Sequence, residues 1–92
     1  MSNSIALHTV PKLNRLFRFQ WEQAQEAYVL LYPEGMIQLN GPAGEILALV
    51  DGERDVQQII AQLQQKFADA GDISQDIVEF LGEAHAQNWI TL

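Results

Sequence analysis

The chain contains no cysteine among its 92 residues. This absence excludes disulfide bridges, thiolate nucleophiles, cysteine-ligated zinc and iron–sulfur clusters. Apolar runs long enough to span a bilayer are also missing. The first ten residues lack the basic start and apolar block of a secretory signal. We therefore expect a cytoplasmic protein that does not associate with membranes.

Basic residues are scarce and unevenly placed. The chain has five Lys and Arg residues against twelve Asp and Glu residues, so its net charge is −7. Residues 1–39 hold three basic and three acidic residues and are neutral, whereas residues 40–92 hold two basic and nine acidic residues. The second half therefore carries the whole negative excess, and no basic residue follows Lys66.

Motifs of catalysis and metal binding are absent as well. The sequence has no G-x-S-x-G, no phosphate-binding glycine loop and no H-E-x-x-H. His85 has neither a histidine nor a carboxylate four residues away, so no helical metal pair forms. Asp76, Glu79 and Glu83 would share one helix face, which is more often a solvated acidic surface than a cation site. We therefore predict a protein that is not an enzyme and has no cofactor or metal of its own.

The first half of the chain predicts a small sheet within a single domain of residues 1–92. Three apolar segments with strand periodicity occupy residues 16–21, 27–32 and 36–39 and are joined by short turns. Such segments pair in an antiparallel sheet, with residues 27–32 central and residues 36–39 at an edge. Residues 1–13 are polar and mixed, and we expect them to form a loose or weakly docked arm.

The second half predicts three helices. Asn40 or Gly41 is the N-cap of the first helix, and Asp55 with Gln58 forms a capping box before the second, over residues 56–67. The third helix begins near Ser74, with Asp72 an equal candidate for the N-cap, and ends at Asn88 in the left-handed conformation. Residues 89–92 form a short closing strand. The fold class is therefore α+β and winged-helix-like: a three-stranded antiparallel sheet followed by three helices and a short C-terminal strand.

Domains of this type bind nucleic acid or peptide, and the charge pattern separates the two. A DNA-binding winged helix needs Arg or Lys on its third helix, which here carries three acids and no base. The edge segment 36–39 lacks the Lys or Pro that would block strand addition, so an extended peptide can pair with it. The alternatives are that the arm or a second copy of the chain covers this edge, or that the domain is a degenerate DNA-binding regulator.

The chain resembles the PqqD family of pyrroloquinoline quinone (PQQ) biosynthesis, a family of recognition elements for ribosomally made precursor peptides. The resemblance covers most of the chain in the expected order, although Asn88 stands where the family usually has glycine. The residues that carry it are Val10-Pro11-Lys12-Leu13, Leu39-Asn40, Ala43, Glu45-Ile46-Leu47, Leu49, Asp51-Gly52, Val56, Ile59, Ile60, Leu63, Asp76, Phe80-Leu81 and Asn88-Trp89-Ile90.

The resemblance implies a peptide chaperone. Members of the family bind the precursor peptide PqqA and present it to the radical S-adenosylmethionine enzyme PqqE, without being catalytic themselves. The family's peptide groove lies between the third strand and the third helix. Ile77, Phe80 and Ala84 are predicted to face the core. The residues that the resemblance assigns to the groove are Met36, Ile37, Gln38, Leu39, Val78, Leu81, Gly82 and His85. A non-catalytic subunit that forms a homodimer through the same edge is the alternative function.

We predict that the protein does not bind duplex DNA at physiological salt, because the acidic third helix would face a polyanion. Fluorescence anisotropy with labelled random duplex measures this directly. Salt-sensitive binding at micromolar protein would contradict the prediction.

Overall fold

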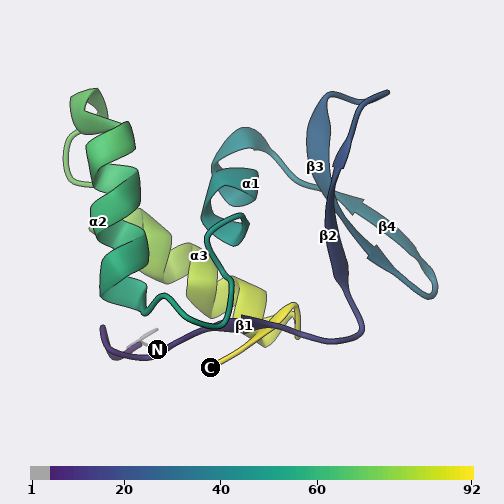
Figure 1. Ribbon diagram of the computed structural model, residues 1–92, viewed down its shortest axis with the longest axis horizontal. Coiled ribbons are helices and arrows are strands. Elements are labelled where there is room, and N and C mark those ends of the chain that lie inside the picture. The colour runs from purple at the N-terminus through teal and green to yellow at the C-terminus, as the bar shows by residue number, and fades with distance from the viewer. Residues whose placement is uncertain (1–4) are drawn as a thin grey trace.

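The structure is a computed structural model that describes residues 5–92. A three-stranded sheet lies to one side, and three helices pack beside it (Figure 1). The predicted fold class is confirmed, while the likeness to winged-helix proteins stays a prediction. The elements in chain order are β1 (Lys12–Leu13), β2 (Arg18–Glu22), β3 (Ala27–Tyr32), β4 (Gly35–Gln38), α1 (Gly41–Leu47), α2 (Val56–Lys66), the short 3₁₀ helix η1 (Ala68–Ala70), α3 (Ser74–Ala86) and β5 (Ile90–Thr91). None of the helices within residues 5–92 is long and apolar enough to cross a membrane.

The sheet is antiparallel in the order β2-β3-β4, so β3 is the central strand as predicted. Leu30 of β3 lies opposite Phe19 on one side and Ile37 on the other. Leu30 is fully buried, and its two partners pack against the main core. This face of the sheet therefore closes the core, because side chains of paired residues point to the same face.

Helix α1 packs against β3, and this contact joins the helices to the sheet. The Asn40 side chain accepts a 2.8 Å hydrogen bond from the Ala43 N–H, so Asn40 is the N-cap. Gly44 lies so close to Tyr28 that a Cβ atom on it would stand 2.7 Å from the Tyr28 ring. That ring is itself enclosed, stacked on Phe19 at 4.7 Å and meeting Trp21 edge-on at 5.1 Å. Only glycine fits at position 44.

Two other helix ends follow the sequence signals, but the start of α3 does not. The N-cap of α3 is Ile73, whose apolar side chain cannot cap the helix, and not Ser74 or Asp72. Asp55 and Gln58 form the predicted capping box, with both hydrogen bonds at 2.8 Å. Asn88 takes a positive φ of 65° after α3, as predicted. The Trp89 N–H donates to the Ala84 carbonyl and the Asn88 N–H to the His85 carbonyl, which together make a Schellman motif. This turn directs the chain into β5.

The N-terminal arm is docked more firmly than expected. Lys12 and Leu13 form β1, which pairs with β5 and runs beside it in Figure 1. The carbonyls of Leu7 and Thr9 accept hydrogen bonds at 2.9 Å from the first N–H groups of α2, and Pro11 is fully buried. These bonds supply partners that a helix N-terminus otherwise lacks. Residues 5–13 are thus part of the fold, and the rest of the predicted arm, residues 1–4, lies outside the described residues.

We predict that Gly44→Ala destabilises the protein by about 1–3 kcal/mol, because the added methyl group collides with an enclosed ring. Gly41→Ala is the matched control in the same helix, since a Cβ atom added there would have no neighbour within 4 Å. Urea denaturation of both variants measures the difference. Equal stability of the two variants would show that α1 does not approach β3 this closely.

Truncation of two buried side chains, one on α1 and one on α2, provides a second test. Ile46 of α1 and Leu63 of α2 are 6% and 3% exposed. Ile46→Ala and Leu63→Ala should each cost about 2–5 kcal/mol through lost burial and the cavity left behind. The control is Leu7→Ala, because Leu7 is 48% exposed. If thermal melts show that both core variants are as stable as Leu7→Ala, the helix faces are wrongly assigned.

Candidate peptide-binding edge and pocket

The free edge of β4 exposes the backbone groups of two residues. The Leu39 N–H donates a 2.9 Å hydrogen bond to the carbonyl of Tyr28, the residue directly opposite. Because bonding direction alternates along an antiparallel strand, Ile37 also bonds to β3, whereas Met36 and Gln38 turn their N–H and C=O groups outward. Within residues 5–92 no strand pairs with this edge. It can therefore accept an added strand.

The side chains of this segment divide between surface and core. Met36 is 44% exposed, and Gln38 is exposed too. Ile37 is half-buried against the core, and Leu39 is only 5% exposed. Leu39 therefore uses its side chain for the core and its N–H for β3, so its assignment to a peptide-binding surface does not agree with the structure.

The predicted groove residues of α3 also differ in exposure. Leu81 is fully buried in the core, because its helical position continues the stripe of Ile77 and Ala84. It cannot line an open groove in this conformation. His85 is exposed and Gly82 half-buried, while Val78 is half-buried against the core. Phe80, predicted to face the core, is half-buried and tilted against Trp89 with 6.4 Å between the ring centres.

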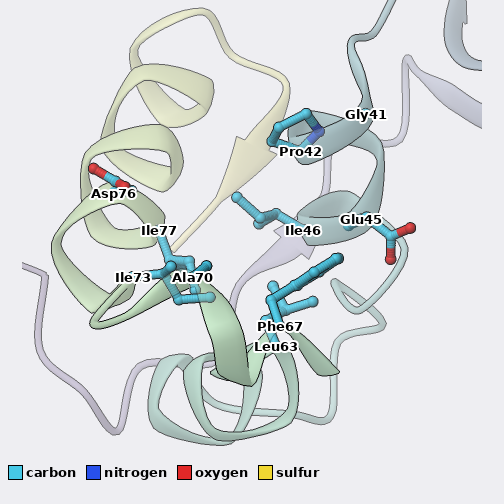
Figure 2. Close-up of a pocket in the computed structure, with 10 residues that line it drawn as sticks. All are labelled: Gly41, Pro42, Glu45, Ile46, Leu63, Phe67, Ala70, Ile73, Asp76 and Ile77. Atoms are coloured by element: carbon cyan, nitrogen blue, oxygen red, sulfur yellow. The ribbon is translucent and has the colours of Figure 1, made fainter. Parts of the chain in front are cut away.

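A pocket of about 450 Å³ lies between the three helices, and the sequence patterns did not predict it. Figure 2 shows apolar side chains from α1, the end of α2 and the start of α3 pointing toward one another around it. The residues that line it are Gly41, Pro42, Glu45, Ile46, Leu63, Phe67, Ala70, Ile73, Asp76 and Ile77. The one signal in the sequence was Phe67, which continues the apolar stripe of α2 beyond the helix end and is 39% exposed.

Charged groups lie at the rim of this pocket. The carboxylates of Glu45 and Asp76 point away from the apolar side chains in Figure 2. Glu45 forms a 2.7 Å salt bridge with Lys66. At the start of α3 the Ser74 N–H and hydroxyl both donate to Asp72, and these hydrogen bonds hold the pKa of the Asp72 carboxyl below its usual value. The pocket therefore combines an apolar interior with a rim on which Glu45 is paired with Lys66, while Asp76 forms no ion pair among residues 5–92.

The pocket and the predicted groove residues lie on different flanks of α3. Ile73 and Asp76 lie to one side of the buried stripe, and Val78 with His85 to the other, because each residue advances about 100° around a helix. Gly41, which lines the pocket from α1, follows Gln38 of β4 by three residues in the sequence. No three His, Cys, Asp or Glu side chains within residues 5–92 are placed to hold one metal ion.

Comparison with known proteins identifies the family. A sequence model described as "Coenzyme PQQ synthesis protein D (PqqD)" matches residues 27–90, more than half of the chain. The chain belongs to the PqqD family. A protein of Pseudomonas aeruginosa named "PqqA binding protein" is 58% identical to this PqqD family member over 95% of each chain. A protein of the same name from Acinetobacter baylyi is 54% identical over 94% of this chain and 87% of its own.

A solved structure supports the same assignment for this PqqD family member. The solution NMR structure of the PqqD truncation of Methylobacterium extorquens PqqCD matches with a TM-score of 0.77 and 30% identity. The match covers 98% of this chain and 97% of the other. That protein is described as a functional, stand-alone recognition element for ribosomally synthesized and post-translationally modified peptides.

Proposed function

We propose that this PqqD family member binds the precursor peptide PqqA by strand addition to β4 and presents it to the radical S-adenosylmethionine enzyme PqqE in the cytoplasm. The observation that carries the proposal is the open backbone of Met36 and Gln38 at the sheet edge. Relatives that are 58% and 54% identical are named for binding PqqA, which supports the choice of peptide.

The main chain of the peptide supplies much of the affinity in such a complex, and pockets for its side chains select the sequence. A strand paired with Gln38 continues past Asn40 toward Gly41, where the pocket begins. An apolar side chain of the peptide enters the pocket there, and its burial contributes about 1.5–3 kcal/mol. The carboxylate of Asp76 at the rim favours a basic residue next to this apolar anchor. The flank of α3 with Val78, Gly82 and His85 is the second candidate for the side-chain contacts.

The proposed role is non-catalytic. A strand bound by its main chain at one edge stays extended, and its flanking residues remain accessible to an enzyme. No nucleophile motif accompanies the edge or the pocket in the sequence. The domain therefore contributes recognition, and the chemistry belongs to the partner.

The alternating backbone of β4 gives the sharpest test. Gln38→Pro removes an outward N–H and should weaken PqqA binding at least about ten-fold, with modest loss of stability. Ile37→Pro removes an N–H that bonds to β3, so it should destabilise the sheet itself. Calorimetric titration of the folded variants with PqqA, beside denaturation curves, separates the two effects.

A folded Gln38→Pro variant that binds PqqA like the wild type would show that the peptide does not add to β4. Sedimentation of the wild type without peptide tests the alternative function. A stable dimer that Gln38→Pro dissociates would assign this edge to a second copy of the chain.

A matched pair of substitutions separates the two flanks of α3. Phe67→Asp places a charge in the pocket wall and should weaken PqqA binding by about ten-fold or more, because a bound apolar side chain would leave that charge desolvated. Val78→Asp places the same charge on the other flank and should leave the affinity unchanged. Val78 is half-buried, so the affinity is measured on protein shown to be folded by circular dichroism. If Val78→Asp weakens PqqA binding and Phe67→Asp does not, the side-chain contacts belong to Val78, Gly82 and His85.

A further inference from the structure

A second hollow lies at one end of the sheet, where the start of β2 meets the end of β3. It encloses about 540 Å³ and is lined by Arg15, Leu16, Phe17, Arg18, Tyr32 and Pro33, among others. Leu16 is 66% exposed, the largest exposed fraction among the large hydrophobic residues described. An apolar side chain this exposed, beside half-buried aromatic rings, is a surface suited to a protein partner.

The loop that carries Leu16 is held in place. The Asn14 side chain accepts a 3.0 Å hydrogen bond from the Leu16 N–H and donates a 2.7 Å bond to the Asn88 carbonyl. The Asn14 N–H donates a 2.8 Å bond to the Trp89 carbonyl. Leu16 is therefore presented by a loop anchored to the turn between α3 and β5, and a partner has little loop ordering to impose.

The charge of this hollow is opposite to that of the rest of the molecule. Arg15 and Arg18 line it, and no acidic residue does, although Glu34 follows Pro33 directly in the sequence. Among residues 5–92 neither arginine takes part in an ion pair, whereas Arg54 and Lys66 are paired with Asp51 and Glu45. A chain of net charge −7 thus keeps two unpaired cations around one apolar surface.

The edge of β2 also has free backbone groups. Along β3 the backbone groups of successive residues point alternately to β4 and to β2. Tyr28 bonds to Leu39 beside β4, so the N–H and C=O groups of Ala27, Val29 and Leu31 point toward β2. Their partners on β2 bond inward, which leaves the N–H and C=O groups of Phe19 and Trp21 facing out. Within the described residues no strand pairs with this edge.

We propose that this basic, apolar hollow on β2 docks the enzyme that acts on the presented peptide, through an enzyme segment with carboxylates beside an apolar side chain. The proposal rests on the proposed function, which requires two partners to be held at once. The edges of β4 and β2 lie on opposite sides of β3, so a peptide on one leaves the other open. Unpaired arginines steer an acidic partner and are matched by its carboxylates.

The experiment compares charge reversal inside and outside the hollow. The double variant Arg15→Glu/Arg18→Glu and the single variant Leu16→Ser should each weaken binding of PqqE by about ten-fold or more, since rim charges and apolar anchors both carry association. The controls are Lys12→Glu, an exposed cation outside the lining, and Leu7→Ser, an exposed leucine elsewhere. Both controls should bind PqqE like the wild type.

Each protein is titrated separately with PqqE and with PqqA by calorimetry, at low and at moderate salt. We expect the hollow variants to keep PqqA affinity within about two-fold and the PqqE affinity of the wild type to fall with salt. If the double variant does not fold, the Leu16→Ser variant alone tests the proposal. The Leu16 side chain is mostly exposed to solvent, so this substitution should leave the protein folded.

PqqE binding that is unchanged in both hollow variants, or absent in the wild type, overturns the inference. Loss of PqqA binding in the hollow variants also overturns it and assigns the hollow to the peptide. Concentration-dependent dimerisation that the double variant abolishes, with PqqE binding unaffected, assigns it to a second copy. If the wild type binds PqqE through this hollow but does not bind PqqA, the proposed function fails while this inference stands.

Discussion

The close approach of α1 to β3 at Gly44 is the contact on which the rest of the structure depends. It joins the sheet to the helices and leaves no space for even one methyl group between Gly44 and the Tyr28 ring. Phe19 and Trp21 enclose that ring from β2, so the contact extends across the sheet. Close-packed interiors transmit such constraints because their side chains have no spare volume. The same short helix therefore packs on β3 and supplies one wall of the pocket.

The N-terminal arm contributes to the fold through its backbone. It supplies carbonyl partners to the start of α2, and β1 pairs with β5 at the end of the chain. The Schellman turn at Asn88 directs β5 toward that pairing, and the neighbouring carbonyls hold Asn14. β1 and β5 are thereby tied to each other. The β4 edge takes no part in this pairing, so it and the loop around Leu16 can be altered separately by mutation.

The sheet has two open edges of different character. The β4 edge exposes the backbone groups of Met36 and Gln38, whereas the β2 edge lies beside exposed Leu16 and two arginines that form no ion pair among residues 5–92. Open edges invite unwanted pairing, and proteins usually block or cover them. A small domain that receives an extended peptide at one edge and an acidic partner at the other would use both edges for recognition.

The local features follow from short-range chemistry and periodicity. These are the capping box at Asp55, the left-handed Asn88, and the order of β2, β3, β4, the three helices and β5. The N-cap of α1 was narrowed to Asn40 or Gly41, and the structure has Asn40. Helical spacing also predicted that Ile77 and Ala84 are buried. It took the tertiary structure to show that Leu39 and Leu81 belong to the core, that residues 5–13 are docked, and where the pocket lies. Periodicity defines the faces of a helix, but which flank lines a pocket depends on neighbours distant in the sequence. The same limit applies to the hollow on β2, because its residues meet only after the strands have paired.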